Sequence, residues 1–500
     1  MSTQEHYDLA VIGGGVNGTG IARDAQGRGL KTLLIEAKDF ASGTSSASTK
    51  LIHGGLRYLE NYEFKMVGEA LAEREVIMRA APHIVWPLRF CLPHSPEQRP
   101  FMMIRAGLFL YDRLGKRELL PGSCGLSLRS GVEGAPLQDW VKRGFLYSDC
   151  WVQDARLVVL NAMDAEARGA TVRTRTAVTK ARRSEDGSQW ILTLKAEDGG
   201  QMQIRSQALV NAAGPWAAQV DAQVMGANKP AQLRLVRGSH IVVRKAFEGD
   251  HAYIFQNTDG RILFAIPYEQ DFTLIGTTDV EHTDDPRAVH CTADEQTYML
   301  DAVNRYFRKT LSDADVVWTY AGVRPLLFEE GKAAAKVSRD YSFRLESKPG
   351  SQRGGGEGGQ APLLTIFGGK LTAYRELSEE AVDHFKPFFD LAPSWTKGAL
   401  LPGGDIGLDF AAALSDFRRE FPDLDPRVSW RLLRNYGSFA RDIATNRGED
   451  LGNGVWRGEI DHLRSREYAR TAEDVLWRRS KLGLSVSDAT VERIQTVVTG

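Results

Sequence analysis

Three glycines near the N-terminus have the spacing that binds a dinucleotide. Gly13, Gly15 and Gly18 follow an apolar run at residues 7–12 that is short enough for a buried strand. In such a pattern the first glycine permits a tight turn, the second lets the backbone approach a pyrophosphate at a helix N-terminus, and the third allows a helix to pack closely on a strand. A second apolar run ends at Glu36, an acid suited to accept ribose hydroxyls. The pattern predicts an adenine dinucleotide site; the alternative is a glycine-rich turn in an ordinary α/β unit.

A loop rich in small hydroxyl side chains follows at residues 42–50. Small residues let the backbone run along a cofactor, while hydroxyls and amides meet phosphate oxygens. The loop leads to His53, Gly54 and Arg57, a cationic turn where the reacting ring of a cofactor could lie. Taken without that context, the same composition describes a flexible polar loop.

Two later segments have a related design. Residues 208–210 are an apolar strand that opens into Ala213-Gly214-Pro215-Trp216, where small residues let the chain pass close to a cofactor. Residues 362–367 are another apolar strand, and the amides of Gly369 to Thr372 are predicted to lie at the helix N-terminus that follows. Such amides bind an anion or a flavin carbonyl, and Lys370 adds a full positive charge. A Walker loop is excluded because its upstream glycine is missing.

Together these segments resemble the FAD-dependent glycerol-3-phosphate dehydrogenases, within the D-amino-acid-oxidase-like flavoproteins. Besides the glycine pattern and the hydroxyl loop, the resemblance is carried by His53-Gly54-Gly55, by Asn211-Ala212-Ala213-Gly214-Pro215-Trp216 and above all by Phe367-Gly368-Gly369-Lys370-Leu371-Thr372. It implies FAD as cofactor. In the family the hydroxyl loop contacts FAD, the His-Gly-Gly turn lies near the isoalloxazine, and the strand that corresponds to Val178 meets the adenine end by its backbone.

The resemblance predicts three sets of site residues. The cofactor set is Gly13, Gly15, Gly18, Glu36, Thr44, Ser45, Thr49, Lys50, Leu51, His53, Gly54, Val178, Ala213, Gly214, Trp216, Gly369, Lys370, Leu371 and Thr372. The substrate set is Arg57, Tyr58, Arg324, Arg339 and Lys370, and the catalytic set is Arg324, His240 and His53.

The roles within these sets follow from the chemistry of a phosphorylated alcohol. A dianionic phosphate in a partly buried site needs several charge-assisted donors, and arginine suits it because its planar fork keeps its charge. Oxidation then requires hydride transfer from carbon to flavin N5 and loss of the hydroxyl proton to a base. His53 and His240 are candidate bases, and Arg324 would stabilise the developing oxyanion. The alternatives are structural histidines and surface arginines.

The expected reaction is oxidation of sn-glycerol 3-phosphate to dihydroxyacetone phosphate, with electrons passed to a membrane quinone. Two alternatives remain open. One is a peroxide-forming FAD oxidase of glycerol 3-phosphate or of an amino acid. The other is a non-catalytic, flavin-bearing membrane scaffold or sensor.

The bulk composition limits the classes of protein. A chain of 500 residues exceeds the size of a single core, so two or three domains are expected. A net charge of −1 gives no basic field, and nucleic acid is not expected as a partner. Cys91, Cys124, Cys150 and Cys291 lie far apart, without metal-binding or disulfide spacing, which fits a reduced compartment and no metal site. We expect no signal peptide, and no apolar run approaches the roughly 18 residues that span a bilayer.

The order of strand-like and helix-like segments predicts a mixed α/β (α+β) chain. A Rossmann-like FAD-binding domain is expected at residues 1–90, 148–230 and 340–392. An inserted antiparallel-sheet cap, residues 231–339, is expected to bind substrate. Residues 393–500 are expected to form a small C-terminal all-helical domain.

Residues 91–147 form a separate basic and apolar segment in this division. Between about residues 71 and 120, aromatic and methionine side chains alternate with arginines, which suits a lipid interface with anionic head groups. The alternative is an amphipathic helix packed on the core with snorkelling arginines. The bacterial members of the family are peripheral membrane enzymes, so we expect peripheral contact with the cytoplasmic face of the inner membrane, and otherwise a cytoplasmic protein. The chain could pair into a homodimer.

Overall fold

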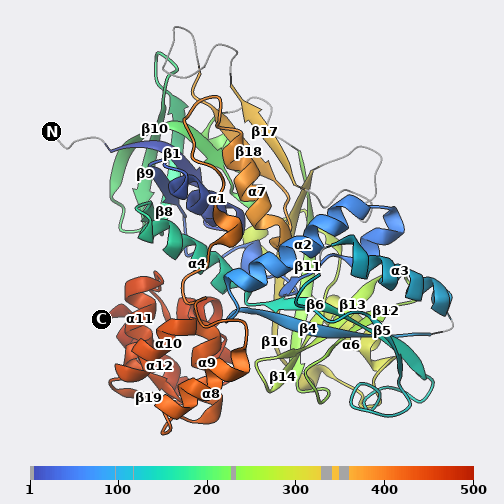
Figure 1. The fold of residues 1–500 in the computed structure, drawn as a ribbon. Helices are drawn as coiled ribbons and strands as arrows, with labels where there is room; N and C mark the ends of the chain where they lie inside the picture. The colour runs from blue at the N-terminus through green and yellow to red at the C-terminus, as the bar shows by residue number, and fades with distance from the viewer. Residues whose placement is uncertain (1–4, 96, 116, 227–231, 328–340, 348–359) are drawn as a thin grey trace.

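The computed structural model describes residues 5–95, 97–115, 117–226, 232–327, 341–347 and 360–500. Figure 1 shows the three expected parts: a domain built on a mostly parallel sheet, a second sheet beside it, and a cluster of helices at the C-terminus. The predicted fold class is confirmed.

The cofactor domain is centred on a twisted sheet with the order β17-β18-β10-β1-β2-β7, in which all neighbours from β18 to β7 run parallel. The strands are β17 Ser342–Glu346, β18 Leu363–Phe367, β10 Gln201–Asn211, β1 His6–Ile12, β2 Thr32–Ile35 and β7 Thr171–Arg173. Strands β8 (Thr176–Arg183) and β9 (Trp190–Ala196) extend β10 as an antiparallel meander. Strands β9 and β10 form a hairpin, and β10 continues without a break to Asn211.

Three helices pack together on one side of this sheet: α1 (Val16–Gly27), α4 (Asp154–Ala167) and α7 (Tyr374–Asp383) (Figure 1). Their apolar side chains and the sheet form one core. Helix α1 approaches the end of β1 so closely that a Cβ atom at Gly18 would lie 1.9 Å from the carbonyl oxygen of Gly13. Only glycine allows this packing, and it brings the N-terminus of α1 to the end of the strand.

The second sheet has the order β15-β11-β14-β13-β12-β4-β6-β3, with β16 paired to β11 and β5 paired to β6. The strands are β3 Leu51–Ile52, β4 Val85–Pro93, β5 Cys124–Ser127, β6 Arg143–Val152, β11 Leu233–Arg244, β12 Ala252–Gln256, β13 Ile262–Tyr268, β14 Phe272–Gly276, β15 Val280–Glu281 and β16 Val316–Leu327. Helix α6 (Ala293–Asn304) packs on one face, while α2 (Phe64–Ala80) and α3 (Phe101–Leu114) pack on the other. Strands β4 and β6 cross the boundaries expected near residues 90 and 148, so the basic, apolar segment belongs to the cap sheet.

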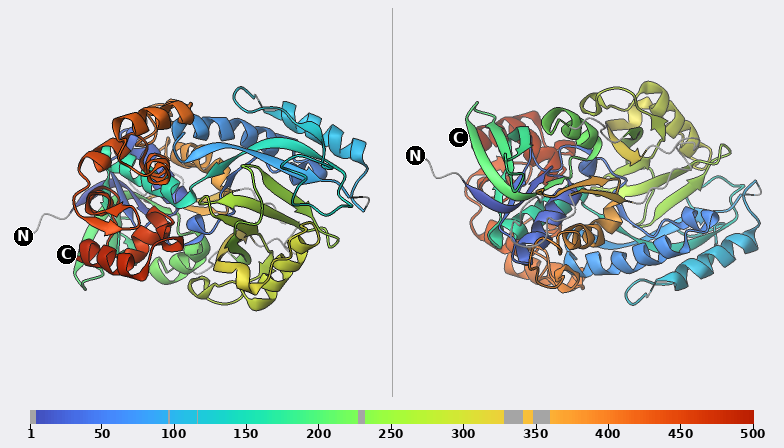
Figure 2. Two further views of the ribbon diagram at one scale, coloured as in Figure 1. Left: turned by 90° about the horizontal axis from the view of Figure 1, so that it is seen from below. Right: turned by 90° about the horizontal axis from the view of Figure 1, so that it is seen from above.

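The C-terminal domain packs helices around a core of its own. Its helices are α8 Phe410–Glu420, α9 Pro426–Tyr436, α10 Ala440–Thr445, α11 Arg457–Arg466, the π-helical turn η11 Asp474–Arg479 and α12 Asp488–Thr499. A short ladder of β19 (Asp450–Gly452) and β20 (Val455–Trp456) is the addition that the sequence did not predict. Both views in Figure 2 place these red helices against the cofactor domain, at the end of the molecule remote from α3.

No helix within the described residues is both long and apolar enough to cross a membrane.

Candidate functional site

A cavity of about 320 Å³ lies at the carboxyl ends of β1, β2, β10 and β18. This is where an open parallel sheet binds its ligand, because the strand ends turn into loops that diverge around a crevice. Many of the predicted cofactor residues line it: Gly13, Gly15, Glu36, Thr44, Ser45, Val178, Ala213, Gly214, Trp216, Gly369 and Leu371. Segments more than 300 residues apart in the chain therefore meet at one cavity.

Glu36 lies in the cavity wall at the end of β2. One carboxylate oxygen accepts a hydrogen bond from the Gly14 amide at 2.6 Å, and the other accepts one from the Lys38 amide at 2.7 Å. Burial raises the pKa of Glu36, and the two amide bonds oppose that rise. A carboxylate has about four acceptor sites, so capacity remains for ribose hydroxyls.

The hydroxyl loop is held from two sides. The Val16 amide of α1 donates to Ser45 Oγ at 3.0 Å. On the other side, Thr44 Oγ1 donates to the Val323 carbonyl at 2.6 Å, and the Tyr320 hydroxyl donates to the Ser48 carbonyl at 2.8 Å. The loop is thus fixed between the cofactor helix and the cap strand β16.

Lys50 and Asp154 anchor the end of this loop. The Lys50 ammonium contacts both Asp154 carboxylate oxygens at 2.9 Å and the Ser46 carbonyl at 3.0 Å. Asp154 also accepts a hydrogen bond from Ser48 Oγ at 2.7 Å. Both ionic side chains are buried. Lys50 does not line the cavity, because Asp154 holds its ammonium elsewhere; its observed contacts position the loop. Leu51 lies next to it, in β3.

The His53 turn is joined to the motif that ends at Thr372. The His53 amide donates to Thr372 Oγ1 at 3.1 Å, and that hydroxyl lies 3.3 Å from the His53 carbonyl. The Gly54 amide donates at 3.0 Å to the hydroxyl of Tyr111, a residue of α3. Tyr111 in turn contacts both oxygens of the buried Asp149 at 2.9 Å. These bonds fix the turn beside Leu371, which lines the cavity.

Two of the predicted substrate residues lie together near this turn. The Lys370 ammonium lies over the Tyr58 ring, 3.8 Å from its centroid. Arg57 belongs to the same 3₁₀ helix as Tyr58, η2 (Leu56–Asn61), but its side chain is outside the described part of the structure. Arg339 also lies outside the described residues.

Arg324 projects from the cap strand β16 across β11. Its guanidinium forms an ion pair with Asp279 and donates to Thr277 Oγ1 at 3.3 Å. A Cβ atom at Gly238 would lie 2.5 Å from Nη2 of Arg324, so glycine at that position leaves room for the guanidinium to cross. The side chain is 27% exposed, which leaves it accessible to a solute.

His240 is buried next to the hydroxyl loop. Its Nε2 lies 2.9 Å from Thr49 Oγ1, and its ring stacks on Tyr320 with centroids 4.7 Å apart. Burial, followed by the nearby charges of Lys50 and Arg324, lowers the pKa of His240 well below its usual value. The imidazole is therefore neutral at pH 7. Its Nδ1 is buried without a hydrogen-bond partner among the described residues.

The arrangement fits FAD. Glycines and small side chains form the walls, the N-terminus of α1 faces the cavity, and an acid stands at the end of β2. Asn17 lines the cavity and donates to the Gly368 carbonyl at 3.2 Å, yet its Oδ1 is a buried acceptor that no described group satisfies. Such an atom is costly unless a ligand pairs with it.

Sequence reasoning missed several residues of the site. Asp154 and Asp279 fix Lys50 and Arg324, but neither has a local pattern that marks it. Asn17 lines the cavity, and its position between Gly15 and Gly18 could have marked it as a cofactor-binding residue.

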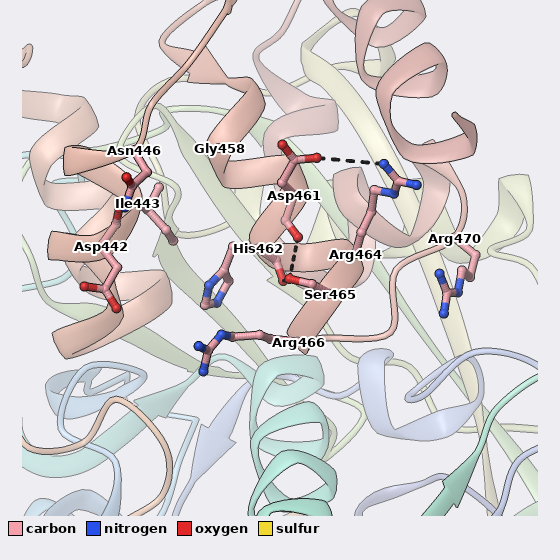
Figure 3. Close-up of a pocket in the computed structure, with 10 residues that line it drawn as sticks. All are labelled: Asp442, Ile443, Asn446, Gly458, Asp461, His462, Arg464, Ser465, Arg466 and Arg470. Carbon is pink, nitrogen blue, oxygen red and sulfur yellow. Dashed lines mark hydrogen bonds and ion pairs between the residues drawn. The ribbon is translucent and has the colours of Figure 1, made fainter.

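A second cavity, of about 430 Å³, lies in the C-terminal domain (Figure 3). It is lined by residues of α10 and α11 and by the segment after them, and Asp461 and Arg464 pair at its rim at 3.8 Å. None of the predicted site residues lines it. The redox chemistry is therefore assigned to the cavity of the parallel sheet.

Comparison with known proteins agrees with this assignment. A family model described as FAD dependent oxidoreductase matches residues 8–375, and one described as the C-terminal domain of alpha-glycerophosphate oxidase matches residues 394–499. The chain is 50% identical to glycerol-3-phosphate dehydrogenase of Pseudomonas aeruginosa, covering 98% of this chain and 94% of the relative. It is 46% identical to D-erythritol 1-phosphate dehydrogenase of Brucella abortus, covering 98% and 97%. Among solved structures, glycerol-3-phosphate dehydrogenase of Bacillus halodurans complexed with FAD matches with a TM-score of 0.74, 27% identity and coverage of 98% and 93%.

Proposed function

Since this chain belongs to the FAD-dependent glycerol-3-phosphate dehydrogenase family, we propose that it oxidises sn-glycerol 3-phosphate to dihydroxyacetone phosphate. The observation that carries the proposal is the cavity at the carboxyl ends of the parallel strands, where the glycine pattern, the hydroxyl loop and the segment of Gly369 and Leu371 meet. FAD, when bound, supplies the acceptor for a hydride. The residues of this chain hold the substrate, remove its proton and exclude water.

Arg324 and Lys370 would hold the phosphate. Both carry full charges, and arginine offers a planar pair of donors for two phosphate oxygens. Support comes from the position of Lys370 over Tyr58 and from the partial exposure of Arg324 on the cap strand. The side chains of Arg57 and Arg339 remain predicted members of the same set.

His240 would accept the proton of the substrate hydroxyl. Its lowered pKa keeps the ring unprotonated at neutral pH, which is the form that a base requires. The Thr49 hydroxyl fixes the ring through Nε2, and Nδ1 is a buried atom without a partner among the described residues. His53 remains the second candidate, because its turn lies beside the cavity.

The substrate test is anaerobic reduction of the flavin. Purified holoenzyme is mixed with sn-glycerol 3-phosphate, D-erythritol 1-phosphate, glycerol or a D-amino acid, and the flavin absorbance is followed. We expect glycerol 3-phosphate to bleach the flavin fastest. Faster bleaching by erythritol phosphate would assign the chain to the activity named for its Brucella relative. No bleaching by any of these compounds would favour the non-catalytic alternative.

A membrane quinone is proposed as the electron acceptor. Support comes from a largely apolar cavity of about 540 Å³ between η2, α3 and the strands β12 and β13, with lining residues that include Leu56, Leu59, Ile104 and Ile254. It is large enough for a lipophilic ring. Reoxidation of the reduced enzyme by a short-chain quinone and by oxygen should be compared. Stoichiometric peroxide without quinone would instead identify an oxidase.

Peripheral contact with the cytoplasmic face of the inner membrane is proposed through α3. Met102 is 72% exposed, Met103 52% and Phe109 51%, whereas Leu108 and Tyr111 of the same helix are buried. Apolar side chains beside arginines suit an interface with anionic lipid. The wild-type protein should float with vesicles that contain phosphatidylglycerol, and the Met102→Glu/Phe109→Glu variant should not.

A further inference from the structure

The C-terminal domain meets the cofactor domain through buried charges. Nη1 and Nη2 of Arg479 donate to the two carboxylate oxygens of Asp39, at 2.6 and 2.7 Å. Arg478 Nε also contacts Asp39, at 2.6 Å. Arg479 is 0% exposed and Asp39 is 2% exposed, so solvent does not weaken these pairs. Asp39 therefore carries two arginines from η11.

Asp39 belongs to one wall of the FAD cavity, which we call the Glu36 wall (residues 36–45). Its carbonyl accepts a hydrogen bond from the Ser42 amide, and the Ala41 amide donates to the Gly14 carbonyl at 3.1 Å. Ala41 has a φ of 56°. A non-glycine residue in this left-handed region is strained, so its neighbours must restrain it. The arginines on Asp39 supply such a restraint.

The neighbouring wall begins at Arg175 and is called the β8 wall (residues 175–178). Thr176, Ala177 and Val178 line the cavity. Arg175 has a φ of 49°, again left-handed, and its guanidinium contacts Asp474 of η11 at 2.8 Å. In this wall a side chain of η11 contacts the left-handed residue itself, whereas in the Glu36 wall the arginines contact Asp39, two residues before the left-handed Ala41.

The two walls are also joined to each other. The Arg175 amide donates to the Lys38 carbonyl at 2.8 Å, and the Thr176 amide donates to the Glu36 carbonyl at 2.9 Å. On the far side, Arg478 contacts both Asp39 and Asp474. The six-residue turn η11 therefore contacts both walls, and Arg478 of η11 joins Asp39 to Asp474.

We propose that η11 is a clamp that retains FAD, and that cofactor retention is a function of the C-terminal domain. The clamp holds the Glu36 wall and the β8 wall in the position that the cofactor needs. It acts through wall position, because Arg478 and Arg479 do not line the cavity. When the clamp is weakened, the walls relax and FAD leaves faster.

The test compares FAD release from two full-length variants. Arg479→Met removes the paired guanidinium. Arg434→Met is the matched control: Arg434 is also a buried arginine of the C-terminal domain, but it donates to the carbonyls of Pro82 and His83, outside both walls. Release is followed as recovery of free-flavin fluorescence after dilution of the holoenzyme. We expect at least tenfold faster release from Arg479→Met and the wild-type rate from Arg434→Met.

The melting temperatures of the apo forms show whether the variants differ in stability without cofactor. The proposal is overturned if Arg479→Met releases FAD at the wild-type rate, or if both variants release it equally fast. If Arg479→Met does not fold, Asp39→Asn takes its place, since it keeps the shape of the side chain and removes its charge. Folded Asp39→Asn with wild-type FAD release would equally refute the clamp.

Discussion

Replacing Arg324 by methionine tests the phosphate grip most directly. Methionine keeps much of the length of the side chain and removes its charge and all its donors. The guanidinium is 27% exposed, and its partner Asp279 is 30% exposed, so the pair is partly solvated. A pair of this kind contributes about 0–1 kcal/mol to the free energy of unfolding. The variant should therefore fold and keep its yellow colour.

The loss in substrate affinity should be much larger. A hydrogen bond to a charged group contributes about 1.5–3 kcal/mol, which corresponds to a roughly 10-fold to 150-fold change in an equilibrium constant. Asp279 would also lose the charge of Arg324 and would repel the phosphate more strongly. We therefore expect the upper part of this range for the rise in the half-saturating concentration of glycerol 3-phosphate.

The assay is an anaerobic titration of flavin reduction against substrate concentration. Arg287→Met is the control, because Arg287 is a surface arginine of the cap that pairs with Asp285. It should titrate like the wild type. An unchanged half-saturating concentration in Arg324→Met, with FAD still bound, would refute the assignment of Arg324 to the substrate phosphate.

Three further predictions concern the scaffold. Gly18→Ala should destabilise the protein by about 1–3 kcal/mol or more and impair FAD binding, because the new methyl group would overlap the backbone at Gly13. Gly107→Ala is the control: a Cβ atom there meets nothing within 4 Å, so the substitution should stabilise α3 by about 0.5–1 kcal/mol. Thermal melts measure both effects. Tyr111→Phe should keep FAD but lower the rate of flavin reduction, since the catalytic turn loses a hydrogen bond; a wild-type rate in stopped-flow would contradict this. Burial alone would raise the pKa of Glu467, but Arg156 lowers this pKa to about 2. The ionised Glu467 therefore stabilises the fold fully above about pH 4.5, and this contribution is lost as the pH falls towards 2. The melting temperature of Glu467→Gln should depend less on pH in that range than that of the wild type.

The sequence could predict those parts of the site whose backbone conformation depends on the local residues. The glycines of the first turn, the small residues around Gly214 and the string that ends at Thr372 each describe how one segment bends. Such bends depend on neighbours in the chain, and most of these residues line one cavity. The predictions for Arg57 and Arg339 rest on resemblance and still await a test.

The parts that sequence could not predict depend on distant partners. Lys50 stays a predicted cofactor residue, but no sequence pattern predicts the contact of its ammonium with Asp154, which is 104 residues away. Arg479 lies 440 residues from Asp39, and no periodicity marks such a pair. Strands β4 and β6 joined the cap sheet because their apolar side chains pack against it, a choice that composition alone leaves open.

The hydrogen bond that the Gly54 amide donates to the Tyr111 hydroxyl lies on the inward face of α3, so the two faces of this helix differ in what they contact. Towards the interior, Tyr111 is buried and bonded both to the His53 turn and to Asp149. Towards the exterior, the side chains of Met102 and Phe109 are largely exposed, and the Arg113 guanidinium lies over the Phe109 ring. Substitutions on the outward face of α3 could therefore adapt the protein to another lipid composition or to a preparation without detergent, provided that Tyr111 is kept.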